Sequence, residues 1–178
     1  MIARAAGIGI AVLAAGAPAT LAAAQTLCRP DEAVVFSCPA GARTASLCAA
    51  KPLSRASRLQ YRFGGARALE LAYPDPAGPA ADAFIAGDMM FAGGGGAWLR
   101  FVRDGYAYTV FTAIGRWGAH GEPASVSGVA VAKDGKAVAN LPCRSEPQSL
   151  IGPDLFETLG LKTADPDAFE IPDAFMPR

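Results

Sequence analysis

Short runs in which apolar and polar residues alternate recur along the chain, separated by turns rich in glycine and proline. The clearest case is residues 93–114, where two runs of aromatic and β-branched residues flank Asp104-Gly105. An Asp-Gly pair tolerates the positive φ angles of a type I′ turn, so this stretch predicts an antiparallel hairpin. Its second arm is apolar almost throughout, which predicts a strand buried on both faces.

Two further hairpins follow from the same kind of pattern. Residues 59–63 and 69–73 alternate around a Gly-Gly turn, with Arg62 and Glu70 expected to share the outer face as an ion pair. Residues 125–132 and 136–141 flank Asp134-Gly135, which predicts another type I′ turn. Residues 59–63 are predicted to form a half-buried strand, and the other three segments are predicted to be strands as well.

Glycine and proline also mark where elements end. Pro74-Asp75-Pro76 is expected to end the strand before it and to open a loop that reaches Asp82. The glycines at 93–96 predict either a mobile loop or a backbone packed closely against a neighbour. Pro153 at the first position and Gly160 past the last predict one short helix over residues 153–159, and no helix is expected before residue 145.

The predicted fold is therefore mostly β. We expect a single antiparallel β-sandwich or barrel-like domain over residues 25–145, followed by a C-terminal segment, residues 146–178, with a short helix and an irregular tail. Phe169, Ile171 and Phe175 are candidates to dock this tail on the domain or on a partner. The length suits one domain with a substantial core.

The first 24 residues have the pattern of a secretory signal peptide. Arg4 supplies a basic start, residues 5–17 an apolar run and residues 22–24 an A-x-A cleavage site. The mature chain would begin at Gln25 and be periplasmic or secreted. The apolar run is too short to span a bilayer core of about 30 Å, and Leu27 is too large for the position before a lipid-modified cysteine. No later stretch predicts a membrane span.

Four cysteines lie in the predicted mature chain: Cys28, Cys38, Cys48 and Cys143. In an exported protein an even number predicts disulfides, here two. The absence of a Cys-x-x-Cys pair argues against zinc, and no other metal site is indicated. A hairpin of residues 34–38 and 44–48 would hold Cys38 and Cys48 at opposite ends, which excludes that pair. Cys28–Cys38 with Cys48–Cys143, or Cys28–Cys48 with Cys38–Cys143, remain.

The charge balance limits the classes of partner. With 16 basic and 16 acidic residues the formal net charge is zero, so the electrostatic attraction that nucleic-acid binding needs is lacking. The glycine run lacks the Lys-Ser/Thr ending of a phosphate loop, and the sequence indicates no cofactor. The arginines interleaved with aromatic residues are instead expected on exposed strand faces; they are Arg58, Arg62, Arg67, Arg100, Arg103 and Arg116.

Candidate catalytic residues are few. His120 is the one histidine and a possible general base, but Ser125 and Ser127 lack the Gly-x-Ser-x-Gly turn of a nucleophile. A pair of carboxylates can cleave glycosidic bonds, and the candidates are Glu70, Asp88, Asp104 and Glu122. Aromatic residues could line a ligand surface, although core packing is favoured for strand aromatics; they are Trp98, Tyr106, Tyr108, Phe111 and Trp117.

Several short motifs occur in a fixed order. They are FSC at 36–38, SLC at 46–48, LQYRFG at 59–64, Tyr73-Pro74, GGGAWLRF at 94–101 and GYAY at 105–108. Over residues 28–143 this order resembles a family of small exported bacterial proteins of unknown function. The resemblance implies an exported, disulfide-containing, β-rich domain and carries no catalytic residue.

These observations favour a non-enzymatic periplasmic or secreted binding module, with an envelope protein or a glycan as its partner. One alternative is a secreted hydrolase that uses His120 or the carboxylates. Another is an inhibitor of a secreted hydrolase such as lysozyme. A third is a stable envelope component whose docking segment is the tail at residues 169–175.

Overall fold

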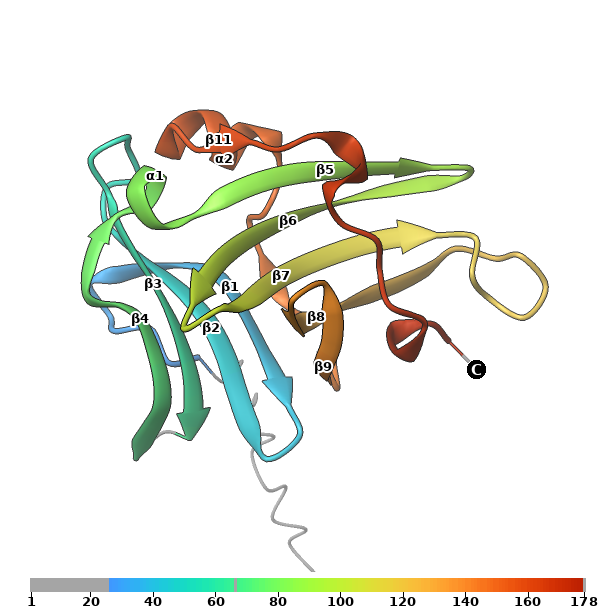
Figure 1. Cartoon of the computed structure of the whole chain (residues 1–178), viewed down its shortest axis with the longest axis horizontal. Helices are drawn as coiled ribbons and strands as arrows, with labels where there is room; N and C mark the ends of the chain where they lie inside the picture. The colour runs from blue at the N-terminus through green and yellow to red at the C-terminus, as the bar shows by residue number, and fades with distance from the viewer. Residues whose placement is uncertain (1–25, 66, 178) are drawn as a thin grey trace, which may run out of the picture.

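The computed structural model describes residues 26–177 with the exception of residue 66. The predicted signal peptide, residues 1–24, lies outside the described residues. Two β-sheets make up most of the described chain, and their strands cross obliquely in Figure 1. The predicted sandwich-like β fold is confirmed.

The first sheet has five strands in the order β10-β1-β2-β3-β4, and every pair is antiparallel. The strands are β1 Glu32–Ala40, β2 Arg43–Ala50, β3 Arg58–Gly65, β4 Ala68–Pro79 and β10 Gln148–Ser149. The β1–β2 hairpin places Val34 opposite Cys48 and Cys38 opposite Ala45, so Cys38 and Cys48 lie at opposite ends of the hairpin, as predicted.

The second sheet has six strands in the order β11-β5-β6-β7-β8-β9. Only the short β11–β5 pair is parallel among the described strands. The strands are β5 Ile85–Phe91, β6 Gly94–Arg103, β7 Tyr106–Gly115, β8 Ala124–Lys133, β9 Lys136–Pro142 and β11 Lys162–Thr163.

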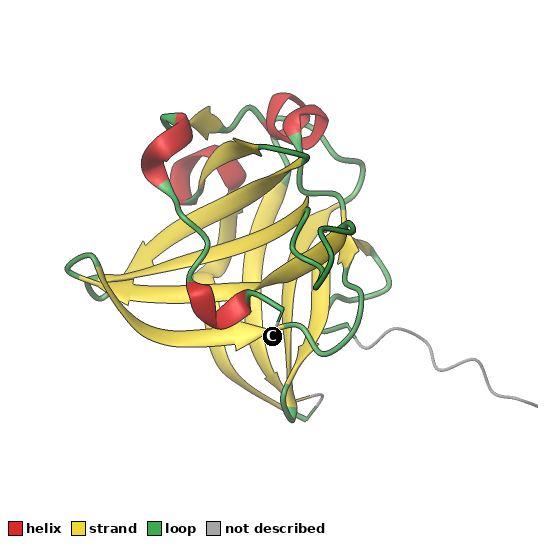
Figure 2. Cartoon of the chain, turned by 90° about the vertical axis from the view of Figure 1, so that its right-hand side faces the viewer, coloured by secondary structure: helices red, strands yellow, loops and turns green. Residues whose placement is uncertain are grey.

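The described helices are short and lie at the periphery, as Figure 2 shows. The predicted helix is present as α2, Pro153–Leu159, and Gly160 ends it in the left-handed conformation with φ 64°. The expectation of no helix before residue 145 was wrong, because α1, Ala80–Ala83, makes one turn. Pro79 precedes this alanine-rich turn, and the Phe84 amide donates to the Ala80 carbonyl at 3.0 Å.

The main core lies between the two sheets and is built around Phe101 of β6. The Phe101 ring stacks on Tyr73 at 4.6 Å and on Tyr108 at 4.8 Å between ring centroids. Tyr61 of β3 adds a tilted contact at 5.1 Å. Strands of both sheets thus contribute to one aromatic cluster, which is the core role expected for strand aromatics.

The central hairpin has the predicted turn, with φ 52° at Asp104 and 79° at Gly105. Its second arm, β7, is buried on both faces. Val110 packs in the main core between the sheets, whereas Phe111 packs in a second cluster on the opposite face. Something must therefore cover the outer face of this sheet.

The C-terminal tail provides that cover. It contains two 3-10 turns, η1 Pro166–Ala168 and η2 Asp173–Phe175, and it crosses the outer face of the second sheet in Figure 1. Phe111 contacts the rings of Phe169 at 5.4 Å and Phe175 at 4.8 Å. The three apolar tail residues predicted to dock, which include buried Ile171, dock on the domain itself.

The structure decides two predictions made at proline and glycine positions: the first was wrong, and the second had left two alternatives open. Strand β4 does not end at Pro74-Asp75-Pro76 but continues to Pro79, because an edge strand tolerates prolines where no ladder donor is needed. Of the two readings for residues 93–96, close packing is correct: β6 begins at Gly94, and a Cβ there would overlap the Ile114 carbonyl.

The disulfides follow the second of the two predicted pairings. Cys28–Cys48 attaches the N-terminal segment, residues 26–30, to β2. Cys38–Cys143 connects β1 of the first sheet with the residue after β9 of the second sheet. Consequently one bond fastens a surface segment and the other joins the two layers of the sandwich.

Candidate functional site

A buried ion pair joins two strands on the outer face of the first sheet. The Arg62 guanidinium on β3 donates to both Glu32 carboxylate oxygens, at 2.6 and 2.7 Å. The expected Arg62–Glu70 pair was wrong, because the β3–β4 register places Arg62 opposite Ala72 and Glu70 pairs with Arg43 instead. Arg62 is 5% exposed, so its expected exposed position was also wrong.

The N-terminal segment, residues 26–30, explains this burial. It lies across the outer face, where the Leu27 carbonyl accepts from Arg62 at 2.9 Å and the Leu27 amide donates to the Ser46 hydroxyl at 3.1 Å. Burial alone would raise the pKa of Glu32. Hydrogen bonds from Arg62 and from the Arg29 amide, with both positive charges, hold the pKa below its ordinary value.

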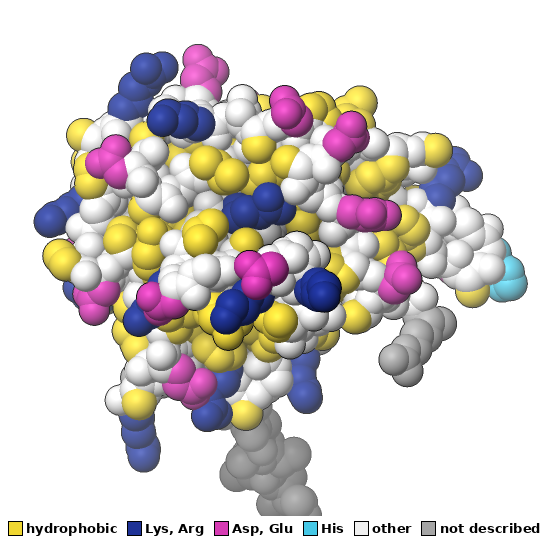
Figure 3. Space-filling model, in the orientation of Figure 1, with side chains coloured by type: hydrophobic (Ala, Val, Ile, Leu, Met, Phe, Trp, Pro, Cys, Tyr) yellow, Lys and Arg dark blue, Asp and Glu magenta, His cyan; other side chains and the backbone are white. Residues whose placement is uncertain are grey.

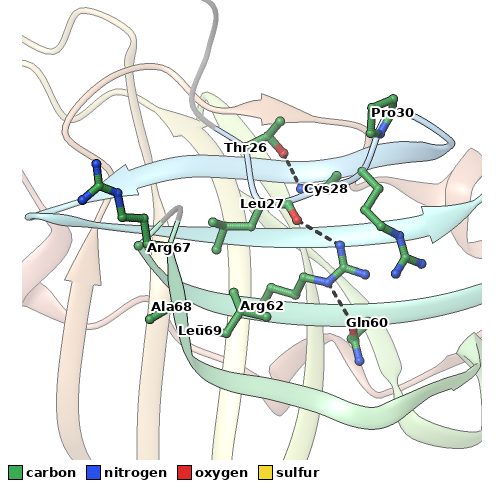
Figure 4. A pocket seen from close by; sticks show the side chains of 11 residues that line it. Thr26, Leu27, Cys28, Pro30, Gln60, Arg62, Arg67, Ala68 and Leu69 are labelled. Carbon is green, nitrogen blue, oxygen red and sulfur yellow. Dashed lines mark hydrogen bonds between the residues drawn. The ribbon is translucent and has the colours of Figure 1, made fainter.

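A cavity of about 580 Å³ is lined in part by Arg62. Figure 4 shows the side chains around it. The Arg62 guanidinium is engaged in hydrogen bonds within the protein. Its Nε donates to Gln60 at 2.8 Å, and its terminal nitrogens donate to Leu27 and Glu32. Arg67 also borders the cavity, and in Figure 4 its side chain points away from Arg62. Arg29, which also lines the cavity, pairs with Asp31 and Glu32. This cluster therefore holds the N-terminal segment in place.

A second hollow, of about 490 Å³, lies between β5, the loop after β7 and the tail. We call it the tail groove. Its apolar surface is formed mainly by Met89, Met90, Phe91, Trp117 and Ile171, and three exposed carboxylates border it: Asp167, Glu170 and Asp173. Figure 3 shows hydrophobic, acidic and basic side chains interspersed on the face that the tail crosses.

The aromatic part of the tail groove is shaped by a glycine. The rings of Phe91 and Trp117 lie 5.0 Å apart between centroids. A Cβ on Gly115 would approach the Trp117 ring to 2.6 Å and Phe91 to 3.0 Å, so this close arrangement needs glycine. Met90 is 90% exposed beside the pair. Such a large exposed apolar side chain next to aromatic rings is characteristic of a contact surface.

The groove has a negative electrostatic character. Among the described residues that line it there is no lysine, arginine or histidine. Arg100 lies nearby but is engaged under the tail, where it donates to the Ala168 carbonyl at 3.0 Å and stacks 4.6 Å from the Trp98 ring centroid. The three carboxylates are thus available to a cationic partner.

The carboxylates and the histidine predicted as catalytic candidates do not form a common centre. Glu70 pairs with Arg43, and Asp104 lies in the central hairpin turn. His120 is exposed in the loop after β7, where its amide donates to Glu122 at 2.9 Å. Asp88 lies on β5. Within residues 26–177, residue 66 aside, no group of three or more His, Cys, Asp or Glu side chains could hold a metal ion.

The sequence interpretation missed the tail groove. Its signals were a Met-Met-Phe run at residues 89–91 and an acidic, aromatic tail, but these two stretches lie far apart in the chain. Of the aromatic candidates, Trp98 and Phe111 are buried and only Trp117 lines the groove.

The chain was compared with known proteins, and no family model, no curated protein and no solved structure matches it. In the part of the chain that the structure describes, none of the helices has the length and apolar character to cross a membrane.

Proposed function

We propose that this protein is an exported, non-enzymatic binding module, periplasmic or secreted, that binds a protein of the cell envelope through the tail groove. The observation that carries this proposal is the groove itself. It combines an exposed methionine, an aromatic pair and three carboxylates in one hollow of about 490 Å³. Exposed aromatic and methionine side chains are enriched at protein interfaces.

Export is supported by two independent features. Residues 1–24 have the pattern of a signal peptide. The structure contains two disulfides, Cys28–Cys48 and Cys38–Cys143. Disulfides form and persist in oxidising compartments outside the cytosol.

A binding role is favoured over a hydrolase because the candidate catalytic groups are dispersed. A general base must lie within hydrogen-bond reach of a nucleophile or substrate. His120 lies in an exposed loop, where its backbone amide donates to Glu122, and Glu70 is paired with Arg43. Neither residue lines the tail groove.

The proposal is tested by affinity capture from the envelope fraction of the host, with tagged mature protein, residues 25–178, as bait. Met90→Glu places a negative charge on a side chain that is 90% exposed, so the fold should be retained. Val138→Glu is the matched control, because Val138 is also exposed, at 53%, and lies on β9.

We expect one stoichiometric protein partner to be captured by the unmodified protein and by Val138→Glu, and to be lost with Met90→Glu. Equal capture by both variants would show that the tail groove is not the binding surface. Recovery of a glycan in place of a protein would contradict the proposed class of partner.

A further inference from the structure

The last part of the described chain, residues 165–177, lies on the second sheet with few hydrogen bonds. This stretch, which we call the tail strap, crosses the outer face of that sheet in Figure 1. Among the described residues a single hydrogen bond joins it to the sandwich, from Arg100 to the Ala168 carbonyl at 3.0 Å. Its other hydrogen bonds close its own 3-10 turns. Apolar contacts therefore provide most of what holds the tail strap in place, through Phe169, Ile171 and Phe175.

Trp98 of β6 lies beneath the tail strap. The residue is 0% exposed, and its ring meets Phe169 of the strap at 6.0 Å between centroids. Its indole Nε1, which lies close to Gly87 of β5, has no hydrogen-bond partner among the described residues. A buried donor without an acceptor destabilises the folded state, and native structures contain few of them. The tail strap thus covers Trp98 without meeting its one polar group.

A second unpartnered polar atom lies on the same face. Asn140 of β9 is opposite Ala130 of β8, and Ala130 belongs to the outer cluster that contains Phe111 and Phe175. Directly opposite residues in a ladder point to the same side of a sheet, so Asn140 faces the side of the strap, where η2 contacts β9. Its Oδ1 is buried. In the part of the chain that the structure describes, Trp98 Nε1 and Asn140 Oδ1 are the only buried side-chain nitrogen or oxygen atoms without a hydrogen-bond partner.

Both atoms thus lie under an element that adds no strand to either sheet. The strap also shows which chemistry this face accepts. It is a proline-containing segment that presents aromatic and aliphatic side chains over residues 169–175, with a backbone carbonyl toward Arg100. A segment of the same kind that also offered hydrogen bonds to Trp98 and Asn140 would bind this face better than the strap does. The strap is therefore an imperfect occupant of its own site.

We propose that the outer face of the second sheet is a peptide-binding site, which the tail strap occupies within the same chain and from which an aromatic segment of another protein displaces it. The incoming segment places apolar side chains where Phe169, Ile171 and Phe175 lie. This inference goes beyond the proposed function, because a segment bound here would dismantle the tail groove, part of whose lining comes from the strap. Binding in the tail groove and binding under the strap therefore exclude each other.

Hydrogen exchange in the mature, oxidised protein tests whether the strap opens on its own. The Trp98 indole N–H should exchange when the strap lifts, whereas the Val110 amide, in the middle of β7, should exchange only when the sandwich opens. We expect a protection factor at least about tenfold lower for the Trp98 indole and for the Phe175 amide than for the Val110 amide. Protection of both groups equal to that of Val110 would overturn the proposal, because the strap would then open only with the whole domain.

Binding is tested with a blocked peptide that has the sequence of the strap, residues 165–177. A second peptide carries serine at the positions of Phe169, Ile171 and Phe175. Each is titrated into the unmodified protein, into Phe175→Ala and into Leu150→Ala. Phe175→Ala removes a ring contact with Phe111 at 4.8 Å between centroids and so weakens docking of the strap. Leu150→Ala is the matched control, because Leu150 is 52% exposed and lies outside the strap.

We expect the strap peptide to bind Phe175→Ala at least about tenfold more tightly than the unmodified protein, because weaker docking raises the fraction of molecules in which the site is free. Leu150→Ala should bind like the unmodified protein, and the serine peptide should bind none of the three. Protection of the Val110 amide shows that each variant is folded. If Phe175→Ala does not retain this protection, Phe169→Ala, which loses two ring contacts, takes its place.

The outcomes separate this inference from the proposed function. Equal affinity of the strap peptide for the unmodified protein and for Phe175→Ala would place its site elsewhere and overturn the proposal. Equal binding of the serine peptide would overturn it too, since the apolar side chains would then not matter, and so would the absence of any binding. In each case the envelope capture with Met90→Glu decides independently whether the tail groove binds a protein.

Discussion

Arg62 and Glu32 form a bidentate ion pair under the N-terminal segment, with nitrogen–oxygen distances of 2.6 and 2.7 Å and side chains only 6% and 7% exposed. They come from β3 and β1, which are separated by β2 in the sheet. Leu27 and Gln60 accept further hydrogen bonds from Arg62. The pair therefore links strands β1 and β3 to the N-terminal segment, residues 26–30, which contains Cys28.

Removal of one partner of this ion pair should lower the free energy of unfolding. Arg62→Met leaves the Glu32 carboxylate buried without its main partner, and such losses cost about 3–5 kcal/mol. The remaining contact of Arg29 with Glu32, at 3.0 Å, favours the lower end of that range. The free energy of unfolding from urea titration measures the effect.

Two further variants make this prediction specific. The double variant Arg62→Met with Glu32→Leu should recover most of the lost stability, because no charge is left buried. Arg67→Met, at an exposed arginine of the same region, should change stability by no more than about 0.5 kcal/mol. A double variant as unstable as Arg62→Met alone would contradict the electrostatic explanation.

Stability should also fall in acid because of Glu32. Its folded-state pKa is lowered, so the unfolded chain binds a proton more readily and stability is gained above the unfolded pKa of about 4.3. This contribution should be lost as the pH falls from there through the lowered folded-state pKa. Chemical denaturation between pH 7 and pH 2 measures it, and Glu32→Gln should show a flatter dependence in the acid range. An equally steep decline in Glu32→Gln would assign the acid sensitivity to other groups.

The two disulfides should differ in their effect on stability. Cys38–Cys143 closes a loop with a sequence separation of 105 residues, and Cys28–Cys48 one of 20 residues. Loop-closure entropy predicts about 4.7 kcal/mol for a loop of about 100 residues and about 3 kcal/mol for one of about 15. Double replacement of Cys38 and Cys143 by alanine should therefore lower stability more than replacement of Cys28 and Cys48. The reverse order in thermal unfolding would show that the N-terminal segment matters more than the joining of the sheets.

The glycine run at the start of β6 should tolerate no side chain at Gly94. In Gly94→Ala the added Cβ overlaps the Ile114 carbonyl of the neighbouring strand, so β6 and β7 must separate locally. We expect a loss of about 1–3 kcal/mol, the usual cost of overpacking. Gly65→Ala is the control, because nothing lies within 4 Å of its added Cβ and no positive φ is required there. Equal melting temperatures for the two variants would contradict close packing of the run.

Much of the fold could be predicted from local sequence. The Asp104-Gly105 and Asp134-Gly135 turns, the apolar β7 and the helix between Pro153 and Gly160 all depend on backbone preferences of a few adjacent residues. The β character of the chain follows from the same short-range alternation. In addition, the geometry of a single hairpin was enough to exclude a Cys38–Cys48 bond.

Tertiary structure decided which distant segments meet. Arg62 was expected in water opposite Glu70, but the N-terminal segment covers it and brings Glu32 within reach. The choice between the two disulfide pairings and the formation of the tail groove depend on the same kind of contact. Local periodicity determines which face a side chain takes. Only the packing of segments far apart in the chain determines whether that face meets water, another strand or the tail.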